Sequence, residues 1–152
     1  MDAFAGSGAL GLEAASRGAG AVLLIDQDPR AVQVLKSNAT AVGLSAIRVQ
    51  RADTWTLGSQ FRPADLPMPI TVLFVDPPYG ESNERIEGWL TQLEQAAWLA
   101  QDAVAVVERS ARTPAFDWPQ RWRTLTDRRY SDTVVHVGQL CGIPSDLTDE
   151  RG

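Results

Sequence analysis

The chain has 152 residues, of which 44% are hydrophobic and 22% are charged, and its formal net charge is -5. This length allows one domain with a real core, and the composition is that of a globular protein rather than a disordered one. A single cysteine, Cys141, excludes an internal disulfide and a zinc site built from several cysteines. Because the sequence has neither an apolar run long enough to span a membrane nor a signal core, we expect a soluble, cytoplasmic domain with no membrane partner.

The first half of the chain alternates strand and helix. Ala21 to Ile25 is a continuous apolar run, which is typical of a parallel strand covered on both faces. Asp28 and Pro29 then begin a helix as N-cap and first helical residue, and Gly43 ends it. Ile47 to Val49 predicts the next strand.

The second half begins in the same way and then changes. Ile70 to Val75 predicts a strongly buried strand, followed by a helix from Asn83 to Leu99 and a third apolar strand from Ala103 to Val107. Trp122 to Tyr130 and Thr133 to Val137 predict two more strands, separated by only two residues. Parallel pairing needs a longer connection, so these two strands should form an antiparallel hairpin.

These elements together predict one α/β domain over residues 1–140 and a C-terminal tail over residues 141–152. The expected architecture is a Rossmann-like, mostly parallel sheet that ends in the antiparallel hairpin.

A glycine-rich loop near the start of the chain is the first candidate site. Gly6, Gly8 and Gly11 form a Gly-x-Gly-x-x-Gly pattern that leads into a helix. Glycines permit a tight turn and a close approach of the backbone to a ligand, although such turns also serve ordinary connections. Asp26 ends the next strand about 20 residues later, where an acid binds ribose hydroxyls. Asp53 follows another strand, where it could either contact an adenine or serve as a turn residue. The glycine loop and these acids fit NAD, FAD and S-adenosylmethionine equally well.

Asp76-Pro77-Pro78-Tyr79 is the second candidate site, at the carboxyl end of a predicted strand. The two prolines remove N–H donors and restrict the backbone, which leaves a rigid stretch of acceptors. A planar amine must pyramidalise before it accepts a methyl group, and acceptors fixed around its N–H bonds favour that geometry. Tyr79 is suited to stack on a base. The alternative is a Pro-Pro turn with a packed aromatic residue, and the combination with the glycine loop favours the functional interpretation.

Five segments carry a resemblance to a known family: Asp2 to Ala19, Leu23 to Asn38, Leu73 to Tyr79, Val106 to Ser110 and Arg128 to Thr133. They resemble the RsmD-type bacterial small-subunit (16S) ribosomal RNA guanine-N2 methyltransferases, which belong to the class I enzymes. The resemblance implies a seven-stranded sheet with an antiparallel last strand, S-adenosylmethionine as cofactor and S-adenosylhomocysteine as product. It implies a cofactor site, with Asp53 near the adenine, made of Asp2, Phe4, Gly6, Ser7, Gly8, Asp26, Gln27 and Asp53. It further implies that Asp76, Pro77, Pro78 and Tyr79 grip the target amine.

Arginines are concentrated near the end of the chain, although the whole chain is acidic. Six of them lie between residues 109 and 129, opposed by two aspartates. Phosphate contacts need clustered Lys and Arg, so this segment predicts a basic face for ribosomal RNA or a small-subunit particle. An ordinary solvated surface is the alternative, which the residues alone favour slightly. The candidate RNA-binding residues are Arg109, Arg112, Arg128 and Arg129.

The family's chain continues upstream of the glycine loop with a strand, whereas Met1 here directly precedes Asp2. We therefore expect most of the first strand to be missing, through an N-terminal truncation or a wrongly assigned start. Its loss would leave neighbouring strands with unpaired backbone groups and uncovered apolar surface. We accordingly expect weak cofactor affinity and little RNA methylation.

Several alternatives stay open at this point. An adenine or glutamine amine would suit the same acceptors as a guanine amine. A nicotinamide-dependent oxidoreductase would use the glycine loop but leaves Asp76 to Tyr79 unexplained, and a non-catalytic module would use neither site for chemistry. Cysteine-nucleophile and His-based hydrolytic chemistry are disfavoured by the positions of Cys141 and His136. We expect a monomer that holds no metal.

Overall fold

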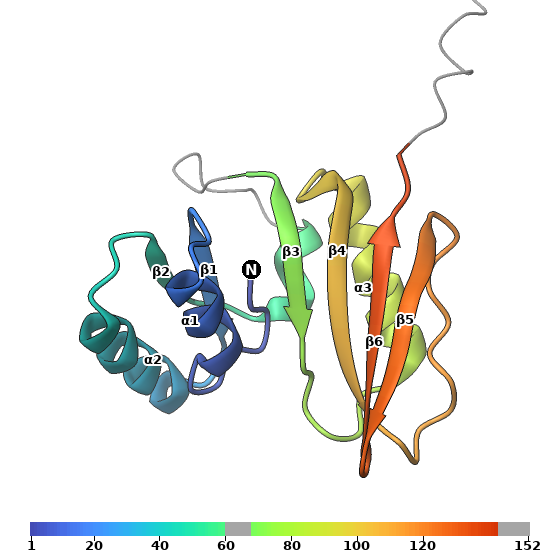
Figure 1. Cartoon of the computed structure of the whole chain (residues 1–152), viewed down its shortest axis with the longest axis horizontal. Helices are drawn as coiled ribbons and strands as arrows, with labels where there is room; N and C mark the ends of the chain where they lie inside the picture. Colours follow the sequence, from blue (N-terminus) through green and yellow to red (C-terminus); the bar gives the residue numbers. More distant parts are fainter. Residues whose placement is uncertain (60–67, 143–152) are drawn as a thin grey trace, which may run out of the picture.

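The computed structural model describes residues 1–59 and 68–142. Its strands form a twisted sheet in two parts, one of two strands and one of four, with helices packed against it (Figure 1). In chain order they are α1 Ala9–Ser16, β1 Val22–Asp26, α2 Pro29–Val42, β2 Ile47–Arg51, the 3-10 helix η1 Thr54–Ser59, β3 Ile70–Val75, α3 Asn83–Gln95, β4 Leu99–Ser110, β5 Trp122–Tyr130 and β6 Thr133–Leu140.

The sheet combines parallel and antiparallel pairs. β1 pairs with β2 and β3 pairs with β4 in parallel, while β6 is antiparallel to both β4 and β5. β6 therefore lies between β4 and β5, in the order β3-β4-β6-β5. The α/β class, the parallel pairs and the antiparallel C-terminal hairpin are confirmed. Fewer of the strand pairs are parallel than predicted. The second hairpin strand, β6, pairs with β4 in place of the first, β5, and this pair is antiparallel.

The first residues of the chain join the two parts of the sheet. Asp2 makes parallel bridges with Leu24 of β1 and Phe74 of β3. The Met1 amino group donates a hydrogen bond to the Val72 carbonyl at 2.7 Å. Beyond Met1 the space between β1 and β3 continues as a largely apolar cavity of about 860 Å³.

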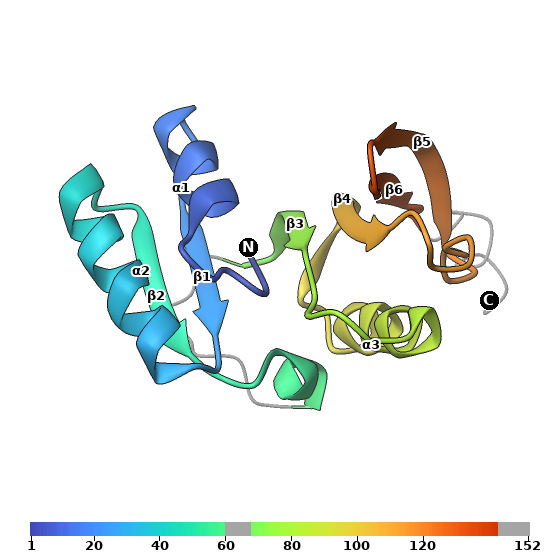
Figure 2. The same cartoon turned by 90° about the horizontal axis from the view of Figure 1, so that it is seen from below.

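Helices cover opposite faces of the sheet (Figure 2). α1 and α2 pack on the face of β1 that presents Val22 and Leu24, together with Leu35 of α2. Leu23 and Ile25 point to the other face and join the larger core, which includes residues of η1 and α3. Because both faces are covered, β1 is apolar from Val22 to Ile25.

α3 is shorter than the sequence predicted. It ends at Gln95, with Ala96 as its C-cap, and Ala97 takes a positive φ of 53°. β4 then begins at Leu99 and runs to Ser110, so it is longer at both ends than the predicted strand. Trp98 and Leu99 are apolar because they are buried in the core, and a run of apolar residues does not distinguish the last turn of a helix from the first residues of a strand.

This arrangement brings Asp26, Asp53, Asp76 and the last residues of β4 to one edge of the sheet, where its parallel strands end. The predicted tail falls mostly on residues 143–152, which lie outside the described part of the chain.

Candidate functional site

The glycine loop is tied to the end of β1 by Asp26. Oδ2 of Asp26 accepts a hydrogen bond from the Gly6 N–H at 2.9 Å, and its Oδ1 accepts one from the Asp28 N–H at 2.9 Å. Gly6 and Gly8 have positive φ angles of 53° and 88°, a region that favours glycine. Asp26 therefore fixes the shape of the loop as well as facing the cavity beside it.

Gly11 and Asp2 seat helix α1 close to the sheet. A Cβ on Gly11 would lie 2.2 Å from Cδ2 of Leu24, so only glycine fits there. Oδ2 of Asp2 accepts a hydrogen bond from the Gly11 N–H at 3.1 Å, and Asp2 is buried. This carboxylate therefore holds the start of the helix from below the loop instead of lining the cavity.

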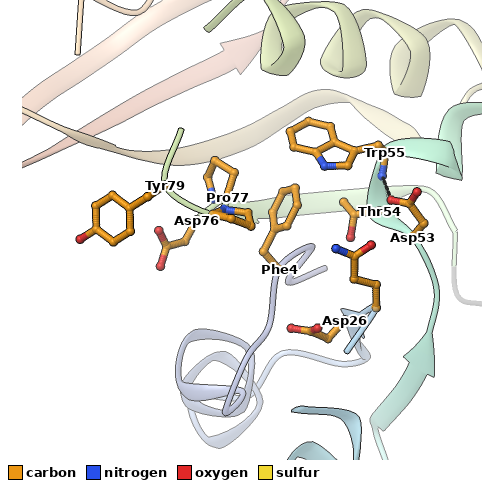
Figure 3. A pocket seen from close by; sticks show the side chains of 10 residues that line it. Phe4, Asp26, Asp53, Thr54, Trp55, Asp76, Pro77 and Tyr79 are labelled. Atoms are coloured by element: carbon orange, nitrogen blue, oxygen red, sulfur yellow. Dashed lines mark hydrogen bonds between the residues drawn. The ribbon is translucent and has the colours of Figure 1, made fainter. Parts of the chain in front are cut away.

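A cavity of about 260 Å³ opens at the carboxyl edge of the sheet (Figure 3). It brings together segments that the sequence analysis identified separately. Its lining is Phe4, Asp26, Gln27, Asp53, Thr54, Trp55, Asp76, Pro77, Pro78 and Tyr79. Asp2, Gly6, Ser7 and Gly8 belong to the supporting loop and do not line this cavity.

Thr54 and Trp55 are the residues of this cavity that the sequence analysis missed. They follow Asp53 in η1, and Oδ1 of Asp53 accepts a hydrogen bond from the Trp55 N–H at 3.1 Å. The ring of Trp55 lies 5.0 Å from that of Phe4, centroid to centroid. The Thr54 hydroxyl donates to the Ala3 carbonyl, which ties η1 to the first residues of the chain. The signal in the sequence that could have identified them is their position directly after Asp53, the acid that follows β2.

Asp76 to Tyr79 form the wall opposite Asp26 (Figure 3). Pro77 is buried, whereas Tyr79 is 99% exposed, so its ring packs on nothing in the described structure. Partial burial raises the pKa of the Asp76 carboxyl above its usual value. Within the described chain nothing donates a hydrogen bond to this carboxylate, so it is available to an incoming donor.

A second, polar cavity of about 410 Å³ lies beyond Asp76 to Tyr79. Its other walls are the end of β4, the loop after it and the turn between β5 and β6. The lining residues from those parts are Glu108, Arg109, Ser110, Arg112, Thr113, Asp132 and Thr133. The Asp76–Tyr79 segment therefore separates two cavities and lines both of them.

The structure divides the candidate RNA-binding arginines. Arg109 is buried, and its guanidinium donates to Oδ1 of Asn83 at 3.0 Å and to the Glu81 carbonyl. It thus fixes the loop after Tyr79 to the start of α3. Arg112 is exposed at the second cavity, and Arg128 and Arg129 are exposed on β5. RNA binding by these four residues stays a prediction.

Within the described residues, no group of three or more His, Cys, Asp or Glu is placed to hold a metal ion. None of the described helices is both long and apolar enough to cross a membrane.

Comparison with known proteins settles the family. Residues 1–139 match the family described as Conserved hypothetical protein 95. The chain belongs to this family. It is 34% identical over 122 residues to the ribosomal RNA small subunit methyltransferase D of Escherichia coli, an alignment that covers 80% of this chain and 58% of the relative. The resemblance to the RsmD type is thereby confirmed, and the chain spans little more than half the length of that relative.

Solved structures have the same fold. A candidate methyltransferase from Escherichia coli superposes with a TM-score of 0.79 at 30% identity, covering 92% of this chain and 74% of that one. An RNA methyltransferase from Salinibacter ruber, solved with S-adenosyl-L-homocysteine, matches with a TM-score of 0.65 at 19% identity, covering 96% of this chain and 83% of that one. These matches confirm the class I methyltransferase fold.

Proposed function

We propose that this chain transfers a methyl group from S-adenosylmethionine to the exocyclic N2 amine of a guanine in small-subunit ribosomal RNA. The observation that carries this proposal is the position of Asp76 to Tyr79 as a wall common to two cavities. One cavity would hold the cofactor and the other the base, so that the target amine meets the methyl group beside Asp76.

The residues of the first cavity fit the cofactor. A carboxylate offers about four acceptor positions, and Asp26 uses two of them for the Gly6 and Asp28 N–H groups. The remaining positions are available to ribose hydroxyls. Phe4 and Trp55 offer apolar ring surfaces, and Asp53 adds an acceptor for an adenine amine. When bound, S-adenosylmethionine supplies an electrophilic methyl group on a positively charged sulfur.

The chain's own residues would orient the nucleophile. The Asp76 carboxylate would accept an N–H of the amine, and carbonyls of the adjoining proline segment would accept the other, which turns the nitrogen lone pair toward the methyl group. Tyr79, exposed at the cavity mouth, would stack on the base. Because the pKa of Asp76 is raised, its carboxylate is also suited to hold the proton that the amine loses.

Ribosomal RNA is inferred from the relatives and guanine from the resemblance to the RsmD type, since similar acceptors would suit an adenine or glutamine amine. The E. coli relative is named as a methyltransferase of small-subunit ribosomal RNA. A nicotinamide-dependent oxidoreductase would give the second cavity no role. A cofactor-binding module without activity would give Asp76 no role. Methyl transfer to a base accounts for both.

The test is an assay on small ribosomal subunits from a strain that lacks this modification. Wild type and Asp76→Asn are incubated with the particles and labelled S-adenosylmethionine, and the nucleosides are identified by mass spectrometry. We expect N2-methylguanosine from the wild type and at least a roughly 100-fold lower rate from Asp76→Asn. A different methylated product would redirect the proposal to another amine.

Calorimetric titration separates the remaining alternatives. Binding of S-adenosylhomocysteine without methyl transfer would indicate an inactive binding module, and binding of NADH in its place would indicate an oxidoreductase.

A further inference from the structure

Glu108 lies next to Asp76 at the edge of the sheet where the second cavity opens. The parallel register pairs Phe74 with Val106 and Val75 with Val107, so the next residues along, Asp76 and Glu108, are neighbours. Side chains alternate along a strand, and paired residues share a face. Asp76 and Glu108 therefore project on the same side, and both line the cavity of about 410 Å³.

The Glu108 carboxylate has no partner within the described chain. No described residue donates a hydrogen bond to it or forms an ion pair with it. The nearby guanidinium of Arg109 is directed to Asn83 and Glu81 instead. Burial and the negative charges of Asp76 and Asp2 raise the pKa of Glu108. A partly desolvated carboxylate beside a second carboxylate lowers stability, so its presence in a cavity wall indicates a ligand that donates hydrogen bonds.

The neighbouring acids match one edge of guanine. On that edge the N1–H lies next to the N2 amine, so two donors face in the same direction. Adenine has an acceptor nitrogen at position 1. A carboxylate facing that nitrogen would form no hydrogen bond, and the two lone pairs would repel each other. A second carboxylate beside Asp76 therefore discriminates between the two purines, whereas Asp76 alone does not.

We propose that Glu108 selects guanine by accepting its N1–H while Asp76 holds the N2 amine. This inference rests on the proposed function and gives it the base specificity that the Asp76–Tyr79 segment lacks. Glu108 is then a specificity-determining residue, and Tyr79 and Asp76 act on any planar amine that enters the cavity.

The test uses 2-aminopurine, which keeps the 2-amine but has an acceptor at N1. Small subunits are reconstituted with RNA that carries either guanine or 2-aminopurine at the methylated position, and kcat/KM is measured for each. We expect the wild type to prefer guanine strongly. In Glu108→Gln the amide can donate to the unprotonated N1, so the guanine preference should fall by about 10- to 100-fold.

Glu13→Gln is the matched control, because Glu13 lies on α1 and its exposed side chain pairs with Arg17. It should keep the wild-type preference. An unchanged preference in Glu108→Gln overturns the inference but leaves the proposed function intact. Equal methylation of both bases by the wild type overturns it without any variant. A wild type that produces no N2-methylguanosine overturns both proposals.

Discussion

The Gly6 N–H donates a hydrogen bond to Oδ2 of Asp26 at 2.9 Å, across 20 residues of sequence. The carboxylate that ends β1 thus shapes the glycine loop and also lines the cavity that the loop borders. If the cavity binds the proposed cofactor, one side chain links the loop conformation to that binding, which makes Asp26 the most informative position in the proposed site.

We expect Asp26→Ala to weaken S-adenosylhomocysteine binding by at least about 10-fold, because the ribose acceptors and the anchor of Gly6 are removed together. Asp26→Asn keeps one acceptor oxygen for the loop and should lose less affinity than Asp26→Ala. Asp117→Ala, at an exposed position away from the cavity, is the control. Calorimetric titration measures all three. Equal affinity in wild type and Asp26→Ala would contradict the assignment.

Two Gly→Ala changes should shift stability in opposite directions. Gly11→Ala places a methyl group 2.2 Å from Leu24 Cδ2, so we expect a loss of about 1–3 kcal/mol in the free energy of unfolding. Gly88→Ala, inside α3, meets nothing within 4 Å and should raise stability by up to about 1 kcal/mol. Urea denaturation measures both. Destabilisation of the same size in both variants would argue against the close packing of α1 on β1.

Tyr79 should affect activity without affecting stability. Because its side chain is 99% exposed, Tyr79→Ala should leave the Tm unchanged. Loss of stacking on the base should lower kcat/KM by about 10-fold or more, whereas Tyr79→Phe keeps the ring and most of the activity. Methyl incorporation into small subunits and a thermal melt provide the measurements. A lower Tm in Tyr79→Ala would point to a packing role instead.

The carboxyl groups of Asp2, Asp76 and Glu108 should make stability depend on pH. Burial is the largest cause of the raised pKa of each. A carboxyl group whose pKa is higher in the folded chain contributes stability below its unfolded pKa, and this contribution is lost as pH rises through the folded pKa. We therefore expect these groups to lower the free energy of unfolding as pH rises from about 4.

Glu108→Gln should remove part of that decrease, because the amide does not ionise. Urea denaturation at several pH values from acid to neutral compares it with the wild type and with Glu13→Gln, whose curve should follow the wild type. Coincident curves for Glu108→Gln and the wild type would show that Glu108 does not titrate differently in the folded chain.

Exposed arginines on β5 should contribute to RNA affinity by binding phosphates. Replacement of Arg128 and Arg129 by Ala should weaken binding and reduce the dependence of log K on log salt by about one for each phosphate that is no longer neutralised. Arg17→Ala, on the exposed face of α1, is a control that removes a charge of the same sign. Fluorescence anisotropy with small-subunit RNA at several salt concentrations measures the slope. Equal slopes for all the proteins would remove β5 from the RNA-binding surface.

Local patterns in the sequence were sufficient to predict the strands and the residues that follow them. Apolar runs identified β1 and β3, and the sequence placed Asp26, Asp53 and Asp76 each at or just after the end of a strand; the structure shows that all three line one cavity. These predictions succeeded because strand periodicity and strand-end chemistry depend on adjacent residues. The C-terminal limit of α3 was wrong, since burial of Trp98 and Leu99 depends on packing outside the local pattern.

The sequence by itself determined the α/β class, the glycine loop, the Asp76–Tyr79 segment and the family to which the chain belongs. Only the tertiary structure decided that β6 lies between β4 and β5, that Arg109 anchors a loop, and that Glu108 stands beside Asp76. Strand order, register and side-chain partners arise from packing between residues far apart in the chain. A pattern that repeats every two or four residues carries no information about such long-range packing.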